Sequence, residues 1–253
     1  MAKKKYLVGN WKMNPDSPEM AKEIFQGIKK VSKNASGVRV IVCPPFVYLQ
    51  SMVKLSEKSG ISIGAQDVFQ KEVGSFTGEV SATMLKMTGV QYVIIGHSER
   101  RNLGEDSEVI RQKVKLVLNA GLSVVLCVGE KIRDTHGAYL EVVKAQIKDV
   151  LAGIDAKLLT KVIVAYEPVW AIGAKEAMNP SQIHEMAIYV RKALREMYDE
   201  ATVRAVKVLY GGSVTTTNTE SILRDGEVDG LLIGRQSLEP KEFSEIISIA
   251  HEM

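Results

Sequence analysis

Short apolar segments alternate with helical stretches along the 253 residues of the chain, which predicts an α/β fold: a closed (β/α)8 barrel of parallel strands. Three observations support this prediction. There are eight such segments, their apolar residues do not alternate cleanly with polar ones, and most segments are separated by helical patterns. Strands that are apolar on both faces are typical of a parallel sheet covered by helices. We expect one barrel domain over residues 1–253.

The predicted strands are rich in β-branched residues and are spread over the whole chain. They are Tyr6–Val8, Val38–Cys43, Ile61–Ala65, Val90–Ile95, Leu122–Val128, Lys161–Ala165, Ala205–Tyr210 and Val228–Ile233.

The predicted helices follow from apolar residues repeated on one face. They cover Glu105–Ala120, Asp134–Gly153, Pro180–Leu194 and Glu239–His251. The third has the clearest start, because Asn179 is a suitable N-cap, Pro180 suits the first helical position, and Gln182 could complete a capping box. A doubly wound open sheet is the alternative fold, but no G-x-G-x-x-G follows the first strand, so a dinucleotide fold has little support.

The composition is that of a soluble globular protein, with 45% hydrophobic and 25% charged residues. The net charge of +3 and the pI of about 8.7 are too weak to indicate nucleic-acid or membrane binding. Cys43 and Cys127 lie in apolar segments, so we expect free buried thiols and a reducing cytosol. The apolar stretch near the N-terminus is too short for a signal peptide, and we expect a cytoplasmic protein.

The residues that could take part in catalysis or binding lie at the ends of the predicted strands. They are Asn10-Trp11-Lys12, Gly96-His97-Ser98-Glu99, Glu167-Pro168, Gly211-Gly212-Ser213 and Gly234-Arg235. In a barrel of this kind the active site is built at the carboxyl ends of the strands. Each group alone is more typical of a structural role, but together they offer a base, a hydrogen-bond donor, an ammonium group and two glycine-rich loops at one mouth.

Six segments of the chain resemble the signature segments of the triosephosphate isomerase family. They are G-N-W-K-M-N at 9–14, G-S-F-T-G-E-V-S at 74–81, G-H-S-E-R-R at 96–101, A-Y-E-P-V-W-A-I-G at 165–173, L-Y-G-G-S-V at 209–214 and D-G-L-L-I-G at 229–234. The resemblance runs in order over essentially the whole chain. It implies the TIM barrel fold and an isomerase of glycolysis and gluconeogenesis that interconverts dihydroxyacetone phosphate and D-glyceraldehyde 3-phosphate through an enediolate.

The resemblance also implies roles for single residues. Glu167 would be the base that removes a proton from the carbon next to the carbonyl. His97 would be a neutral hydrogen-bond donor to the carbonyl oxygen, because Ser98 and Glu99 would open a short helix whose amides disfavour imidazolium; this family is itself an established example of that arrangement. Asn10 and Lys12 would complete the electrostatic set. Arg100 and Arg101, by contrast, are expected to be structural or interfacial.

Further roles concern Lys12, the phosphate, the lid and assembly. Glu99, the fifth member of the catalytic set, would either transfer protons or position Lys12, and we expect the positioning role. The phosphate would be bound by Asn10, Lys12, Gly173, Ser213, Gly234 and Arg235. The lid residues would be Pro168, Val169, Trp170, Ala171, Ile172 and Gly173, with the lid ending near Met178. The loop from Gln70 to Val80 would form a homodimer, with Thr77 reaching toward the partner's site. The resemblance implies no cofactor and no metal.

The chain departs from the family pattern at three places. Ala174–Met178 replaces the usual T-G-K-T-A, which predicts a competent lid with altered kinetics. Arg235-Gln236 stands where Gly-Ala is usual, so the Arg235 amide can serve phosphate only if its backbone tolerates a side chain. Thr215–Thr217 stands where Lys-Pro is common. Two rival functions are another phosphate-binding barrel enzyme and a non-catalytic barrel scaffold.

Overall fold

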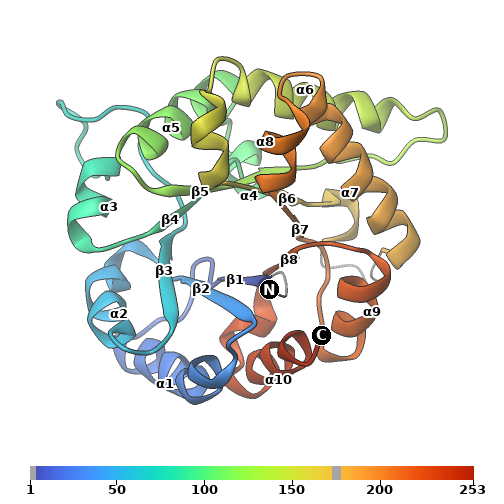
Figure 1. Cartoon of the computed structure of the whole chain (residues 1–253). Coiled ribbons are helices and arrows are strands. Elements are labelled where there is room, and N and C mark those ends of the chain that lie inside the picture. The colour runs from blue at the N-terminus through green and yellow to red at the C-terminus, as the bar shows by residue number, and fades with distance from the viewer. Residues whose placement is uncertain (1–3, 173–177) are drawn as a thin grey trace.

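The computed structural model describes residues 4–172 and 178–253, and its strands form a closed, fully parallel barrel in the order β1 to β8. The strands are β1 (Lys5–Asn10), β2 (Val38–Cys43), β3 (Ile61–Ala65), β4 (Tyr92–Ile95), β5 (Ser123–Val128), β6 (Val162–Tyr166), β7 (Lys207–Tyr210) and β8 (Gly230–Ile233). Figure 1 shows the ring of strands enclosed by the helices. The predicted (β/α)8 barrel is confirmed.

The helices lie on the outside of the ring and connect successive strands. They are α1 (Pro18–Asn34), α2 (Leu49–Ser56), α3 (Ala82–Thr88), α4 (Ser98–Asn102), α5 (Ser107–Asn119), α6 (Ala138–Leu151), α7 (Pro180–Arg195), α8 (Glu200–Ala205), α9 (Thr216–Asp225) and α10 (Pro240–His251). Short 3-10 helices are η1 (Phe46–Tyr48), η2 (Ala156–Lys161), η3 (Val169–Ala171) and η4 (Arg235–Leu238). No helix among the described residues is long and apolar enough to cross a membrane.

The strand ends differ from those predicted, for a physical reason. The first strand is longer than Tyr6–Val8, because Lys5 and Asn10 also pair with β2 although their polar side chains give no apolar signal. The strands β4 to β8 begin later than predicted, because residues such as Val90 and Val228 are buried in the turn that enters the strand. Apolar composition therefore predicts which residues are buried better than it predicts which residues pair in strands.

The helix predictions are confirmed in type and position, with one correction. Asn179 is the N-cap of α7, and its side-chain oxygen accepts a hydrogen bond from the backbone amide of Ser181. The predicted capping box with Gln182 is wrong, because the Asn179 oxygen points to the nearer amide. A capping box does form at α9, between Thr215 and Asn218.

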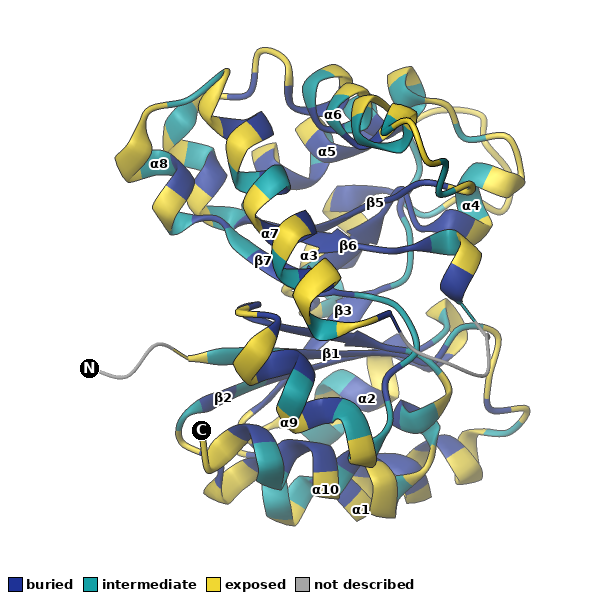
Figure 2. Cartoon of the chain, turned by 90° about the vertical axis from the view of Figure 1, so that its right-hand side faces the viewer, coloured by how far each residue is buried: buried dark blue, intermediate teal, exposed yellow. Residues whose placement is uncertain are grey.

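The hydrophobic core has two parts, which together bury both faces of the strands. One fills the inside of the barrel and consists of Val8, Ile41, Cys43, Ile94, Val125, Cys127, Ile163, Ala165, Leu209 and Leu232. The larger part lies between the strands and the surrounding helices. Figure 2 shows the buried strands and the exposed outer faces of the helices. This packing fixes the carboxyl ends of the strands as a rigid frame for side chains.

Candidate active site

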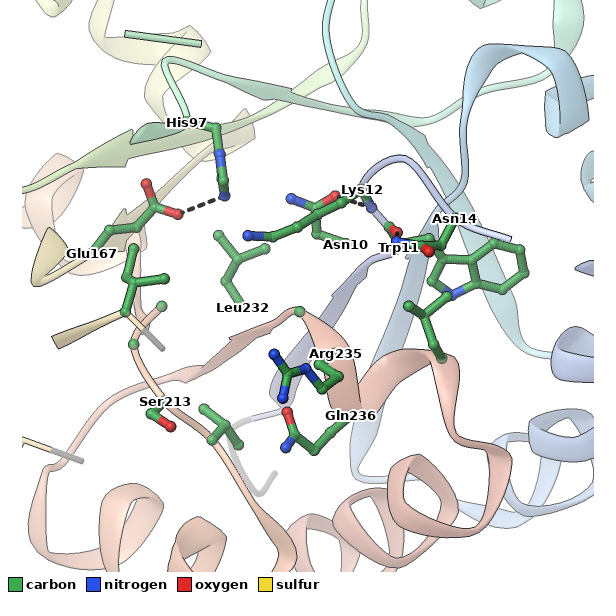
Figure 3. Close-up of a pocket in the computed structure, with 16 residues that line it drawn as sticks. Asn10, Trp11, Lys12, Asn14, His97, Glu167, Ser213, Leu232, Arg235 and Gln236 are labelled. Atoms are coloured by element: carbon green, nitrogen blue, oxygen red, sulfur yellow. Dashed lines mark hydrogen bonds and ion pairs between the residues drawn. The ribbon is translucent and has the colours of Figure 1, made fainter. Parts of the chain in front are cut away.

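A cavity of about 470 Å³ lies at the carboxyl ends of the strands. It brings together residues from the ends of β1, β4, β6, β7 and β8, as Figure 3 shows. The predicted site residues that line it are Asn10, Lys12, His97, Glu167, Ile172, Ser213, Gly234 and Arg235. Segments far apart in the sequence therefore converge on a single pocket.

Glu167 directly follows β6 and is almost completely buried, with 2% of its surface exposed. Its Oε1 lies 3.1 Å from Nε2 of His97, and its Oε2 accepts a hydrogen bond of 3.0 Å from the backbone amide of Ser98. Its own amide donates to the carbonyl of Val128 at the end of β5. These bonds hold the carboxylate in a defined position.

His97 is the N-cap of the short helix α4, and its Nδ1 accepts a 3.2 Å hydrogen bond from the Glu99 amide. This bond leaves the ring proton on Nε2, which donates to Glu167. Burial lowers the pKa of His97, but the attraction and hydrogen bond of Glu167 outweigh it, so the pKa is raised overall. The Glu99 amide at Nδ1 therefore favours the predicted neutral imidazole. The Glu167 carboxylate beside Nε2 raises the pKa of His97 and favours imidazolium while the two side chains are in contact.

Lys12 has a left-handed backbone conformation, with φ of 53°, which is uncommon for a residue with a side chain. The side chain of Gln66 supports it by donating hydrogen bonds to the carbonyls of Lys12 (2.8 Å) and Cys43 (2.9 Å). The Asn10 side-chain oxygen accepts from the Lys12 amide. The Lys12 ammonium pairs with the Glu99 carboxylate at 2.7 Å.

The loops after β7 and β8 form the wall of the cavity opposite Glu167 and His97. Ser213, Gly234 and Arg235 line the cavity there. Arg235 is not among the residues with positive φ, so its backbone tolerates a side chain. This is the condition under which its amide can serve phosphate. Gly173 and residues 174–177 lie outside the described residues.

The first hinge of the predicted lid is tied to the barrel by Glu130, a buried residue that follows β5. Its backbone carbonyl accepts from the Val169 amide at 3.0 Å. Its Oε1 accepts from the Trp170 indole and from the Tyr166 hydroxyl, both at 2.9 Å, and Arg133 pairs with the same oxygen. Glu130 therefore connects the end of β5 to Val169 and Trp170, at the start of the predicted lid.

Sequence reasoning missed Gln66 and Glu130. Gln66 directly follows β3, and Glu130 lies two residues after the end of β5, so their place at strand ends was the available signal. The expectation for Arg101 fits the structure, because its guanidinium donates to the carbonyls of Gly96 and Cys127. Arg100 likewise pairs with acidic groups outside the cavity.

The barrel and the site define a class: (β/α)8-barrel proteins whose cavity at the carboxyl ends of the strands holds a buried carboxylate in contact with a histidine. The sequence model of triosephosphate isomerase matches residues 5–250. The chain belongs to the triosephosphate isomerase family, whose members interconvert dihydroxyacetone phosphate and glyceraldehyde 3-phosphate. Membership decides against both alternatives raised from the sequence, another phosphate-binding barrel enzyme and a non-catalytic scaffold.

Similar curated proteins come from several bacteria. The triosephosphate isomerase of Dictyoglomus thermophilum is 38% identical over 247 residues, which are 97% of this chain and 99% of the relative. That of Fusobacterium nucleatum is 40% identical over 95% of this chain and 96% of the relative. That of Bacteroides fragilis is 39% identical over 97% of this chain and 98% of the relative.

Proposed function

We propose that the cavity at the strand ends is where the chain interconverts dihydroxyacetone phosphate and D-glyceraldehyde 3-phosphate, with Glu167 as the base. One observation carries this assignment: the Glu167 carboxylate and the His97 ring lie 3.1 Å apart in the cavity that Lys12 also lines. A base, a donor and a cation are the groups that proton removal next to a carbonyl requires.

Glu167 takes the proton from one carbon and returns it to the neighbouring carbon. In the structure its carboxylate contacts His97 and the Ser98 amide, so it has to leave these partners to reach the substrate. This move frees the Nε2–H of His97, which then donates to the substrate's carbonyl oxygen instead. His97 also carries the hydroxyl proton of the enediol from one oxygen to the other. Departure of the carboxylate also removes the charge that raises the pKa of His97, which favours a neutral ring during the reaction.

Lys12 and Asn10 stabilise the negative charge that grows on the oxygens of the enediolate. Both are held by the end of β1, and Glu99 orients the Lys12 ammonium. Preorganised groups of this kind each stabilise the transition state by about 2.7–4 kcal/mol. Glu99 acts through Lys12, as a positioning residue.

The phosphate end of the substrate is bound by the loops after β7 and β8, a common location in this fold. Backbone amides of Ser213, Gly234 and Arg235 are the proposed donors, and all three residues line the cavity. Ile172 lies on the same cavity and forms part of its cover. A closed cover excludes water from the enediolate and hinders the loss of phosphate.

The test compares Glu167→Gln with Glu185→Gln, a carboxylate exposed on α7 and outside the cavity. Turnover of glyceraldehyde 3-phosphate is measured for both. The amide cannot accept the proton, so Glu167→Gln should lose at least about 10²–10⁴-fold in kcat. Glu185→Gln should match the unmodified chain. Comparable turnover in the two variants would remove Glu167 from the role of base.

Homodimerisation is a further part of the proposal. Large apolar side chains are exposed in the connections that follow β1 to β4, which are neighbouring strands. They are Met13, Met20, Phe46, Val47, Val73, Phe76, Met84, Met87 and Leu103. Figure 1 shows the connection after β3 extending away from the barrel. Exposed apolar surface of this kind favours a protein partner, and a second copy fits the resemblance.

Sedimentation at micromolar concentration tests assembly. Val73→Asp, in the loop that also carries the exposed Thr77, should give a monomer, whereas Ile132→Asp, at an exposed site after β5, should remain a dimer. A monomeric unmodified chain would contradict the proposal.

A cytoplasmic location is also proposed, because Cys43 and Cys127 are free, buried thiols and the reaction belongs to glycolysis.

A further inference from the structure

Arg235 adds a guanidinium group to the active-site cavity. It is the first residue of η4 and lines the cavity from the loop after β8. Figure 3 shows its side chain directed into the cavity, beside Gln236. The side chain is solvent-exposed, and within residues 4–172 and 178–253 no ion pair or side-chain hydrogen bond engages it. It is therefore free to bind a ligand.

The other charged groups of the cavity already have partners. The Lys12 ammonium pairs with Glu99 at 2.7 Å, and the Glu167 carboxylate contacts His97 and the Ser98 amide. Glu99 thus offsets much of the charge on Lys12. Among the described residues that line the cavity, Arg235 is the cation whose charge is not compensated.

The backbone at Arg235 accommodates this side chain without strain. The described non-glycine residues with positive φ are Lys12, Lys58 and Glu227, and Arg235 is not one of them. An arginine at this position also keeps the backbone N–H that a glycine would supply. The chain therefore gains a side-chain cation and loses no backbone donor.

We propose that the Arg235 side chain binds the phosphoryl group of the substrate directly and is a specificity-determining residue for a dianionic group. A phosphate monoester carries a charge of about −1.5 to −2 at pH 7. Guanidinium has a planar set of N–H donors that can bind two phosphate oxygens at once. The inference rests on the proposed function, because that function places the phosphate between the loops after β7 and β8.

The contribution of Arg235 should appear in binding more than in chemistry. The phosphoryl group takes no part in proton transfer, and we expect its contact with the exposed Arg235 side chain to be about equally strong in the ground and transition states. Such uniform binding lowers KM and leaves kcat nearly unchanged. The same contact should also bind free inorganic phosphate, and raised salt should weaken it because Arg235 is exposed.

The experiment uses Arg235→Gln, Arg235→Lys and a control, Lys241→Gln, which removes an exposed positive charge on α10. Turnover of glyceraldehyde 3-phosphate gives kcat and KM, and calorimetry gives the Kd for inorganic phosphate. Arg235→Gln should raise both KM and this Kd by about 10-fold or more, as expected for a lost charge-assisted hydrogen bond. Arg235→Lys should give KM and Kd values between those of the unmodified chain and those of Arg235→Gln. Lys241→Gln should change neither KM nor Kd.

An unchanged Kd for phosphate in Arg235→Gln would overturn the inference. So would an equal rise of this Kd in Lys241→Gln, which would indicate an effect of net charge alone. A fall in kcat at constant KM would also contradict it. Thermal unfolding of each variant shows that the fold is retained. The calorimetry needs no turnover, so weaker phosphate binding by Arg235→Gln in a chain without isomerase activity would sustain this inference while refuting the proposed function.

Discussion

A Cβ atom on Gly129 would lie 1.7 Å from the carbonyl oxygen of Glu167. The two backbones approach this closely because the Glu167 amide donates a hydrogen bond to the carbonyl of Val128, the residue before Gly129. The absence of a side chain at Gly129 therefore sets the position of the proposed base. Contact between backbones leaves no flexible group that could move aside.

Gly129→Ala should lower kcat by at least about 10-fold, because a displacement of about 1 Å at a catalytic group can cost 10²-fold. Gly37→Ala is the matched control, since its Cβ would meet only a His251 ring atom at 3.8 Å. Turnover and thermal unfolding are measured together. Full activity in a stable Gly129→Ala chain would contradict this account of how Glu167 is placed.

Glu99→Gln should impair catalysis while leaving stability almost unchanged. The Lys12–Glu99 pair is partly exposed, with 31% and 56% of the side chains accessible, so its loss should cost at most about 1 kcal/mol of unfolding free energy. Misplacement of Lys12 should lower kcat/KM by about 10-fold. Chemical unfolding and turnover separate the two effects. A large loss of stability at normal kcat/KM would assign Glu99 a structural role.

Glu167→Gln should lower the pKa of His97. In the unmodified chain, burial lowers this pKa and the Glu167 carboxylate raises it by more. Without the carboxylate, burial remains and the shift should reverse, which an NMR titration of the ring can follow. Because the folded pKa is raised, the pair stabilises the fold fully below the unfolded value of about 6.5. That stabilisation is lost as pH rises through the folded pKa. An unchanged ring pKa in the variant would contradict this coupling.

Lys113→Met should destabilise the fold by about 3 kcal/mol. The Lys113 side chain is 3% exposed and pairs with Asp67 at 2.7 Å and Glu105 at 2.6 Å. Its loss leaves two poorly solvated carboxylates close together. The Arg100 guanidinium still pairs with both, so the cost should lie at the lower end of that for removing one partner of a buried pair. Lys115→Met, at an exposed position on α5, should have little effect. Urea unfolding of both variants provides the measurement, and equal stabilities would refute the prediction.

The sequence predicted the barrel well because its strands are buried on both faces. A run such as Val124 to Val128 shows this in composition alone. Strand ends were less predictable, because the signal of burial extends into turns, as at Val90, and fades at polar paired residues such as Lys5. Pairing is a property of the neighbouring strand, which local composition does not contain.

The site was predictable where a residue lies at a strand end and matches a family segment, as for His97 and Glu167. The supporting contacts were not predictable. Gln66 and Glu130 act through hydrogen bonds to residues distant in sequence, and those distances exist only in the folded chain. The coupling that raises the pKa of His97 likewise depends on a 3.1 Å contact between two strand ends.

Cys43 and Cys127 both belong to the apolar cluster inside the barrel, and burial raises the pKa of each thiol. Neither sulfur is exposed to solvent or poised to ionise while the ring of strands is closed. A thiol-reactive reagent can therefore modify them only when strands separate. The rate of covalent labelling at the two cysteines therefore measures how often the barrel opens.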